Sequence, residues 1–128
     1  MLVVKYFLPA FVWCCAMLVL LLIPGDFIPH VYTFSEWLQW DKLIHCGLFS
    51  VFCVLLLTGL DGYRLKFVRK KDYLTAFLLS VAIGAITECL QYCMSTGRDG
   101  NVYDFCANVV GSGLGCLFFF LWKKNKAN

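Results

Sequence analysis

The chain has 128 residues, of which 61% are hydrophobic and 15% charged, with a formal net charge of +3. Because soluble domains are usually about half apolar or less, this composition excludes an ordinary soluble domain and indicates a single integral membrane domain over residues 1–128. The apolar residues form four runs, at roughly 6–23, 43–60, 73–94 and 103–122. Each approaches or exceeds the ~20 residues that cross a bilayer, where a helix satisfies its own backbone polar groups. We therefore predict an all-α bundle of four transmembrane helices.

The first run has one feature of a secretory signal, because Lys5 precedes it. Its apolar length is too great for a signal, and the following Ile23–Asp26 stretch offers no small-residue cleavage site, so we expect a retained helix. The segment 24–41 that follows carries aromatic residues such as Trp37 and Trp40, which prefer the headgroup zone of a membrane. We expect this segment to anchor on the outer leaflet or else to cover the polar residues that come next.

Three polar residues, Asp41, Lys42 and His45, open the second run. Asp41 and His45 are one helical turn apart and so share a face. A carboxylate beside a histidine suits a general base that the carboxylate orients, and it also suits a metal site. The chain has only 2 histidines and no cluster with metal-ligand spacing, so we expect no metal and no cofactor.

The third run contains small residues and ends in polar ones. Ser80, Gly84 and Glu88 are four apart and fall on one helical face, and Gln91 follows within a turn. Small residues let helices approach closely, so we expect this face to meet another helix. Glu88 lies ~10 Å inside the span, where an isolated carboxylate is costly. Pairing with a cation, an interhelical hydrogen bond or protonation would offset that cost.

A single arginine, Arg98, follows the third run in the turn-forming segment 95–101. A guanidinium at the mouth of a pocket suits bidentate capture of phosphate or carboxylate. An ion pair with Asp99 or Asp104 explains the same residue without a ligand. Both interpretations remain open from the sequence.

The fourth run repeats the pattern of the third. Asp104, Asn108, Gly111 and Gly115 recur at steps of four, three and four, so one face carries polar residues at its start and glycines below them. Because consecutive spans cross a membrane in opposite directions, the starts of the second and fourth runs meet the end of the third. We expect the polar residues of these three runs to form one pocket, held together by small-residue packing.

Basic residues concentrate in two segments outside the runs. The segment between the second and third runs and the C-terminal tail contain Arg64, Lys66, Arg69, Lys70, Lys71, Lys123, Lys124 and Lys126. The positive-inside rule then places both termini in the cytoplasm and the pocket on the outer side. No aromatic–basic interleaving accompanies these residues, so we expect contact with anionic lipid and no nucleic acid.

Taken in order, the polar motifs have the spacing of a known family. They are Asp41-Lys42-x-x-His45, Glu88-x-x-Gln91, Arg98 and Asp104-x-x-x-Asn108-x-x-Gly111-x-x-x-Gly115. Over about 41–121 the chain resembles the VanZ-like family of bacterial integral membrane proteins. The founding member is an accessory protein associated with teicoplanin resistance. The resemblance implies a cell-envelope role at the outer face of the bacterial cytoplasmic membrane, and it implies no particular reaction.

Three functional hypotheses follow. The first is binding of a lipid-linked anionic envelope molecule, such as a polyprenyl phosphate, or of a lipophilic glycopeptide. The second is a membrane-embedded hydrolase or transferase with His45 or Glu88 as general base and Arg98 stabilising developing charge. The third is a purely structural cluster that holds the helices together. Membrane lipids are expected partners in each case, and self-association into a homo-oligomer is left open.

Overall fold

Four helices make up almost all of the structure. The computed structural model describes residues 2–23, 40–65, 68–94 and 101–127. The helices are α1 (Leu2–Leu22), α2 (Trp40–Tyr63), α3 (Lys70–Met94) and α4 (Val102–Ala127). All four are long and apolar enough to cross a membrane, so the prediction of an all-α protein with four candidate spans is confirmed.

The helices differ in length from the predicted spans. Helix α1 begins at Leu2, before the first predicted span of about 6–23, and ends at Leu22. Helix α4 continues past the last predicted span, to Ala127. The predicted spans follow the apolar runs alone, whereas a helix can continue through charged residues where the helix dipole favours their charge. In α4, Lys124 and Lys126 lie in the last turn, where positive charge is favourable.

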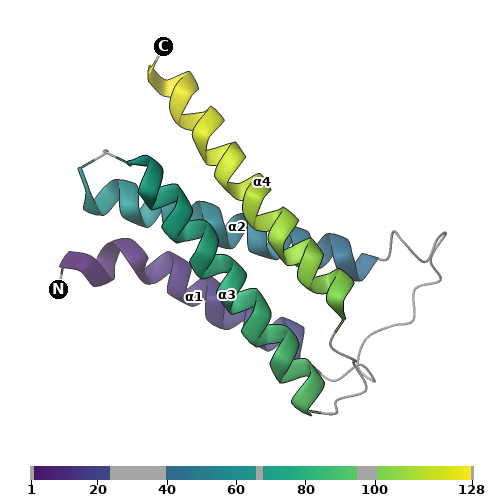
Figure 1. Cartoon of the computed structure of the whole chain (residues 1–128). Coiled ribbons are helices and arrows are strands. Elements are labelled where there is room, and N and C mark those ends of the chain that lie inside the picture. Colours follow the sequence, from purple (N-terminus) through teal and green to yellow (C-terminus); the bar gives the residue numbers. More distant parts are fainter. Residues whose placement is uncertain (1, 24–39, 66–67, 95–100, 128) are drawn as a thin grey trace.

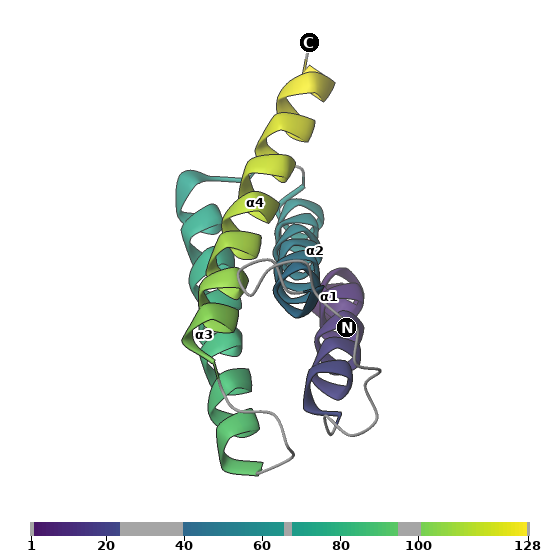
Figure 2. The ribbon, with the colours of Figure 1, turned by 90° about the vertical axis from the view of Figure 1, so that its right-hand side faces the viewer.

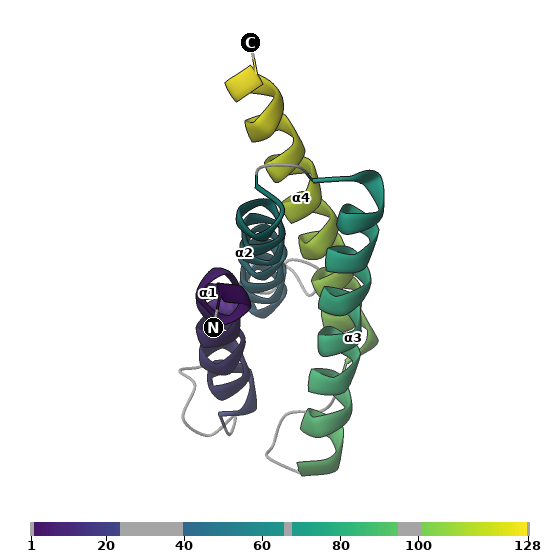
Figure 3. The same cartoon turned by 90° about the vertical axis from the view of Figure 1, so that its left-hand side faces the viewer.

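Helix α2 lies at the centre of the bundle. It packs against each of the other three helices, whereas α1 and α4 are not neighbours within the part of the chain that the structure describes. Figures 2 and 3 show α1 beside α2, with α3 and α4 laid across them. In Figure 1, α2 and α4 begin and α3 ends toward the right, whereas both termini lie toward the left. The helix ends that carry the predicted pocket residues therefore meet at one end of the bundle.

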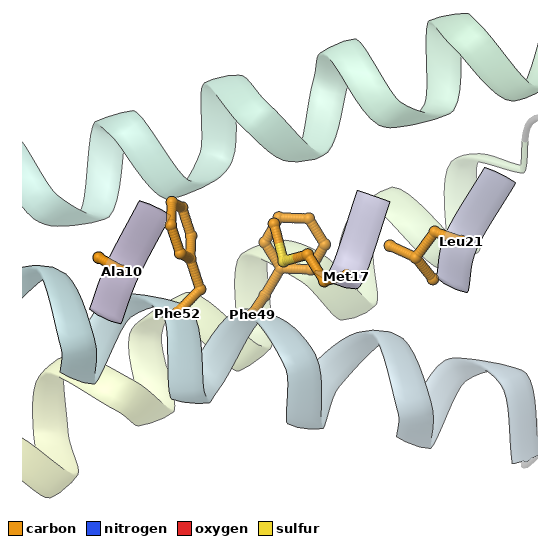
Figure 4. Packing of buried hydrophobic residues seen from close by; sticks show 5 residues of the cluster. All are labelled: Ala10, Met17, Leu21, Phe49 and Phe52. Carbon is orange, nitrogen blue, oxygen red and sulfur yellow. The ribbon is translucent and has the colours of Figure 1, made fainter. Parts of the chain in front are cut away.

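Buried apolar side chains form the core between the helices. Ala10, Met17 and Leu21 lie along one face of α1 and meet Phe49 and Phe52 of α2 (Figure 4). A second cluster, between α2, α3 and α4, comprises Cys53, Leu57, Ala76 and Phe119. Many large apolar side chains on all four helices are exposed, as expected where the neighbour is lipid. In lipid, helices are held by close packing and interhelical hydrogen bonds more than by the hydrophobic effect.

Glycine brings α4 into backbone contact with α2. A Cβ at Gly111 would overlap the carbonyl oxygen of Cys46, and a Cβ at Gly115 would overlap that of Ser50. The atoms in the way belong to the backbone and cannot rotate aside. Only glycine therefore permits this approach at these two positions.

The contact between α3 and α4 also uses small residues. A Cβ at Gly84 would lie 3.1 Å from Cβ of Asn108. One turn away, Ser80 Oγ lies 2.7 Å from Ser112 Oγ, and Ser112 Oγ donates to the carbonyl oxygen of Asn108 at 2.8 Å. The hydroxyl of Ser80 therefore donates to that of Ser112. This serine pair fixes the register of α3 against α4 beside the polar residues of the pocket.

Candidate functional site

Three helices bring three polar side chains into direct contact. His45 of α2 is fully buried, and its Nδ1 lies 2.9 Å from Oδ1 of Asn108 on α4. Asn108 Nδ2 donates to Oε1 of Glu88 on α3 at 3.2 Å, and the same oxygen lies 3.7 Å from His45 Nδ1. Residues far apart in the sequence thus form one hydrogen-bonded group, which we call the polar cluster together with Asp41, Lys42 and Asp104.

The direction of these hydrogen bonds determines where His45 carries its proton. A carboxylate only accepts hydrogen bonds, so the amide nitrogen of Asn108 faces Glu88 and the amide oxygen faces His45. His45 Nδ1 must therefore donate to Asn108 Oδ1. In the neutral ring this leaves the lone pair on Nε2. Glu88 and Asn108 together hold the imidazole in one tautomer and one orientation.

The second nitrogen of His45 faces the carboxylate of Asp41. His45 Nε2 is buried, has no hydrogen-bond partner among the described residues, and lies 4.0 Å from Oδ1 of Asp41. One ligand atom each from Asp41, His45 and Asp104 lie within 4.8 Å of one another. The sequence led us to expect no metal, but this arrangement has the donor atoms of a metal site.

The polar cluster contains one lysine. Lys42 Nζ lies 3.7 Å from Oδ1 of Asp104 and 6.0 Å from the centre of the Tyr103 ring. It is the one lysine or arginine among the described residues at this end. Asp41 and Asp104 lie in the first turns of α2 and α4, where the helix dipole favours negative charge.

Glu88 also binds the start of α4. Its Oε2 accepts the backbone N–H of Asn101 at 3.2 Å, and Asn101 Oδ1 accepts the N–H of Tyr103 at 3.0 Å. Asn101 therefore caps α4, which an asparagine directly before a helix could have indicated. Asn101 was not among the predicted site residues.

A cavity of about 380 Å³ lies beside the polar cluster, between the end of α3 and the start of α4. Its lining is mostly apolar or aromatic and consists of Ala85, Glu88, Cys89, Tyr92, Cys93, Asn101, Val102 and Phe105. Tyr92 and Val102 are 76% and 75% exposed, so the cavity reaches the outer surface of the bundle. Of the predicted site residues, only Glu88 contributes to its wall. The cavity depends on the angle between two helices and has no sequence motif.

One predicted site residue, Gln91, lies apart from this group. Gln91 is buried, and its Nε2 donates to the carbonyl oxygen of Leu21 at the end of α1, at 2.8 Å. The structure therefore gives Gln91 a helix-packing contact. Arg98 lies outside the described residues, as does nearly all of the aromatic segment 24–41.

The opposite end of the bundle carries tight ion pairs. Lys123 Nζ lies 2.8 and 3.0 Å from the two carboxylate oxygens of Asp61. Asp72 accepts the backbone N–H of Arg69 at 2.7 Å, and Arg64 Nη2 lies 3.3 Å from its other oxygen. These cations were predicted to set the topology and to contact anionic lipid, and the structure shows that they also join α2 to α4 and to α3.

Comparisons with protein-family models, curated proteins and solved structures each found no match. The resemblance to the VanZ-like family therefore stays a prediction from the motif spacing. The polar cluster and the cavity beside it are the features of the structure that bear on function.

Proposed function

We propose that this chain is a cell-envelope membrane protein of VanZ-like type that binds a lipid-linked anionic molecule between α3 and α4. The observation that carries the proposal is the apolar cavity of about 380 Å³ with Glu88 in its wall, at the edge of the polar cluster. Ligand sites are typically apolar hollows of ~300–1,000 Å³ that end in a few convergent polar groups. The ligand's hydrocarbon chain occupies the cavity and its head group lies at the cluster.

The size and position of the cavity favour a single lipid chain. Its rim includes the exposed residues Tyr92 and Val102, so a chain can enter sideways from the bilayer. The volume suits part of one hydrocarbon chain and excludes the peptide core of a glycopeptide. A polyprenyl phosphate and a lipophilic glycopeptide both carry a hydrocarbon chain that can occupy this cavity.

An anionic head group needs cations to receive it. At this end the sequence supplies Lys42, which faces Asp104, and Arg98, which lies outside the described residues. A guanidinium binds phosphate through two parallel hydrogen bonds and a lysine acts as a point charge. These two residues are the proposed contacts for the phosphate.

The experiment is native mass spectrometry of protein extracted in mild detergent from bacterial membranes. Ala85 lines the cavity, so Ala85→Phe should fill it and abolish retention of a polyprenyl-phosphate mass. Ala82 is exposed three residues earlier, so Ala82→Phe is the matched control and should retain the lipid. If Ala85→Phe and Ala82→Phe retain equal amounts of polyprenyl phosphate, the lipid does not bind in this cavity.

Two further arms identify the head group and the source of the chain. Arg98→Ala should reduce retention of the phosphate without lowering the melting temperature. Added lipophilic glycopeptide should bind the wild type and Ala82→Phe if its acyl chain is the natural occupant. Binding of the glycopeptide alone, with no polyprenyl phosphate retained, would replace the phosphate proposal by the glycopeptide one.

We also propose that the protein lies in the bacterial cytoplasmic membrane with both termini inside. The support is the concentration of basic residues at the end of the bundle where both termini lie. A fluorescent protein fused to the C-terminus should then be fluorescent, and an exported phosphatase fused there should be inactive. The reverse pair of results would invert the topology and place the polar cluster inside.

A hydrolase or transferase is the second candidate function. It is favoured by His45 Nε2, a buried lone pair oriented by Asn108 and Glu88 as a general base is oriented in many enzymes. This hypothesis predicts turnover of a lipid-linked substrate that His45→Gln abolishes. A screen of retained lipids that finds no altered product would leave binding as the function.

A further inference from the structure

We propose that Asp41, His45 and Asp104 form a binding site for one divalent metal ion. The three ligand atoms lie within 4.8 Å of one another and come from the first two turns of α2 and the first turn of α4. Ligand atoms bound to an ion at ~2.0–2.2 Å stand roughly 3–4 Å apart. An inward movement of about 1 Å or less therefore closes the site around an ion.

The strongest evidence is the unused nitrogen of His45. The side chain is fully buried, and Nε2 has no hydrogen-bond partner among the described residues although it points toward Asp41 at 4.0 Å. A buried polar atom left without a partner is costly. A metal ion is the partner that a neutral imidazole lone pair between carboxylates suits best.

The surroundings of His45 match those of metal-binding histidines. Such a histidine usually donates its other N–H to a fixed acceptor, which sets the tautomer and orients the lone pair. Here Nδ1 donates to Asn108 Oδ1 at 2.9 Å, and Asn108 is itself held by Glu88 at 3.2 Å. Asn108 and Glu88 are thus positioning residues for this site.

One cation lies beside the proposed ligands. Lys42 Nζ lies 3.7 Å from Asp104, so the ion and the ammonium compete for that carboxylate.

The donor set indicates the kind of ion. One imidazole nitrogen and two carboxylate oxygens suit a divalent transition metal such as Zn²⁺, Fe²⁺ or Mn²⁺. Three protein ligands leave open positions that a phosphate oxygen can take, which would let an acidic cluster receive an anionic lipid. That last consequence rests on the proposed function, whereas metal binding does not.

The test uses Mn²⁺ alone, because the 8 cysteines of the chain would compete for Zn²⁺. Lipid-depleted protein in detergent is titrated with Mn²⁺, and free Mn²⁺ is measured by electron paramagnetic resonance. We expect one bound ion per chain. Pulsed measurements should detect coupling to an imidazole nitrogen in the wild type and none in His45→Gln.

The variants separate this site from non-specific binding. Asp41→Asn and His45→Gln should weaken binding at least about tenfold, and Asn108→Ala should weaken it by ~10–100-fold through loss of the positioning bond. Asp61→Asn removes a carboxylate at the other end of the bundle and should bind like the wild type. Lys42→Met removes the competing ammonium and should bind several-fold tighter.

Two results would overturn the proposal. One is that the wild type binds Mn²⁺ no more strongly than Asp41→Asn does. The Asp41 side chain is 37% exposed, so this substitution should not unfold the protein. The other is bound Mn²⁺ with no nitrogen coupling. Because no lipid is present, either result leaves the lipid-binding proposal standing, and a failed lipid experiment leaves this one standing.

Discussion

The two polar ends of the bundle handle charge in different ways. At the end near the termini, two carboxylates have close cationic partners: Lys123 lies 2.8 Å from Asp61, and Arg64 lies 3.3 Å from Asp72. These pairs join α2 to α4 and to α3, and they leave little charge for a ligand. We call this end the paired end.

The printed contacts of the polar cluster at the other end are longer. Lys42 lies 3.7 Å from Asp104, while Asp41 and Glu88 lie 4.0 and 3.7 Å from His45. The buried Nε2 of His45 has no hydrogen-bond partner among the described residues, and proteins keep such an unfavourable feature mainly where function needs it. Carboxylates thus form close ion pairs at the paired end and surround a histidine at the cluster.

The largest expected effect lies between the two ends, where α4 touches α2. Gly111→Ala places a methyl group against the carbonyl oxygen of Cys46, so the helices must separate and both ends must lose their register. We expect a loss of about 3 kcal/mol in the free energy of unfolding, at the upper end for overpacked sites. Thermal melting in detergent measures it.

Gly113 provides the control for this substitution. A Cβ added there meets nothing within 4 Å, so Gly113→Ala should be neutral or stabilise by up to about 1 kcal/mol through helix propensity. Equal melting temperatures for the two alanine variants would mean that α2 and α4 are farther apart than in this structure.

The next effect tests the paired end itself. Asp61→Asn removes the partner of Lys123 in a pair whose side chains are only 14% and 29% exposed. Breaking a fully buried pair costs more, so we expect about 2 kcal/mol here. Chemical denaturation of the wild type and Asp61→Asn measures the difference. If Asp61→Asn lowers the free energy of unfolding by less than a typical surface substitution does, the ion pairs of the paired end do not stabilise the bundle.

A smaller effect separates packing residues from binding residues near the cluster. Gln91→Met keeps the size of the side chain but removes its hydrogen bond to the carbonyl oxygen of Leu21. We expect a loss of about 1 kcal/mol, with lipid retention and Mn²⁺ affinity unchanged. Loss of ligand binding in a variant that melts normally would instead return Gln91 to the binding site.

The four helices could be predicted from the sequence because apolar length is a local property. Helical spacing also indicated which residues share a face, and the structure brings His45, Glu88 and Asn108 into contact. The ends of the helices were less predictable, since polar residues with favourable charge extend them. Gln91 shows another limit, because a residue less than one turn from Glu88 faces a different helix.

Features that depend on how helices cross could not be predicted. The cavity requires the angle between α3 and α4, and the pair Asp61–Lys123 requires the register of two helices whose residues are 62 apart in the sequence. The grouping of Asp41, His45 and Asp104 could not be predicted either, because it also depends on how two helices cross. Asp104 approaches Asp41 and His45 only through the glycine contacts of α4 with α2.

Asp41→Asn, for which we expect the smallest change in stability, compares the polar cluster most directly with the paired end. Asp41→Asn is the same substitution as Asp61→Asn. It loses a favourable charge at the start of α2 but relieves repulsion among the carboxylates that face His45. These effects oppose each other, so we expect a change within about 0.5 kcal/mol, together with weaker Mn²⁺ binding. A loss as large as that of Asp61→Asn would mean that the cluster is built for packing, like the paired end. If Asp41 serves to bind a ligand, Asp41→Asn should leave the free energy of unfolding unchanged and weaken Mn²⁺ binding.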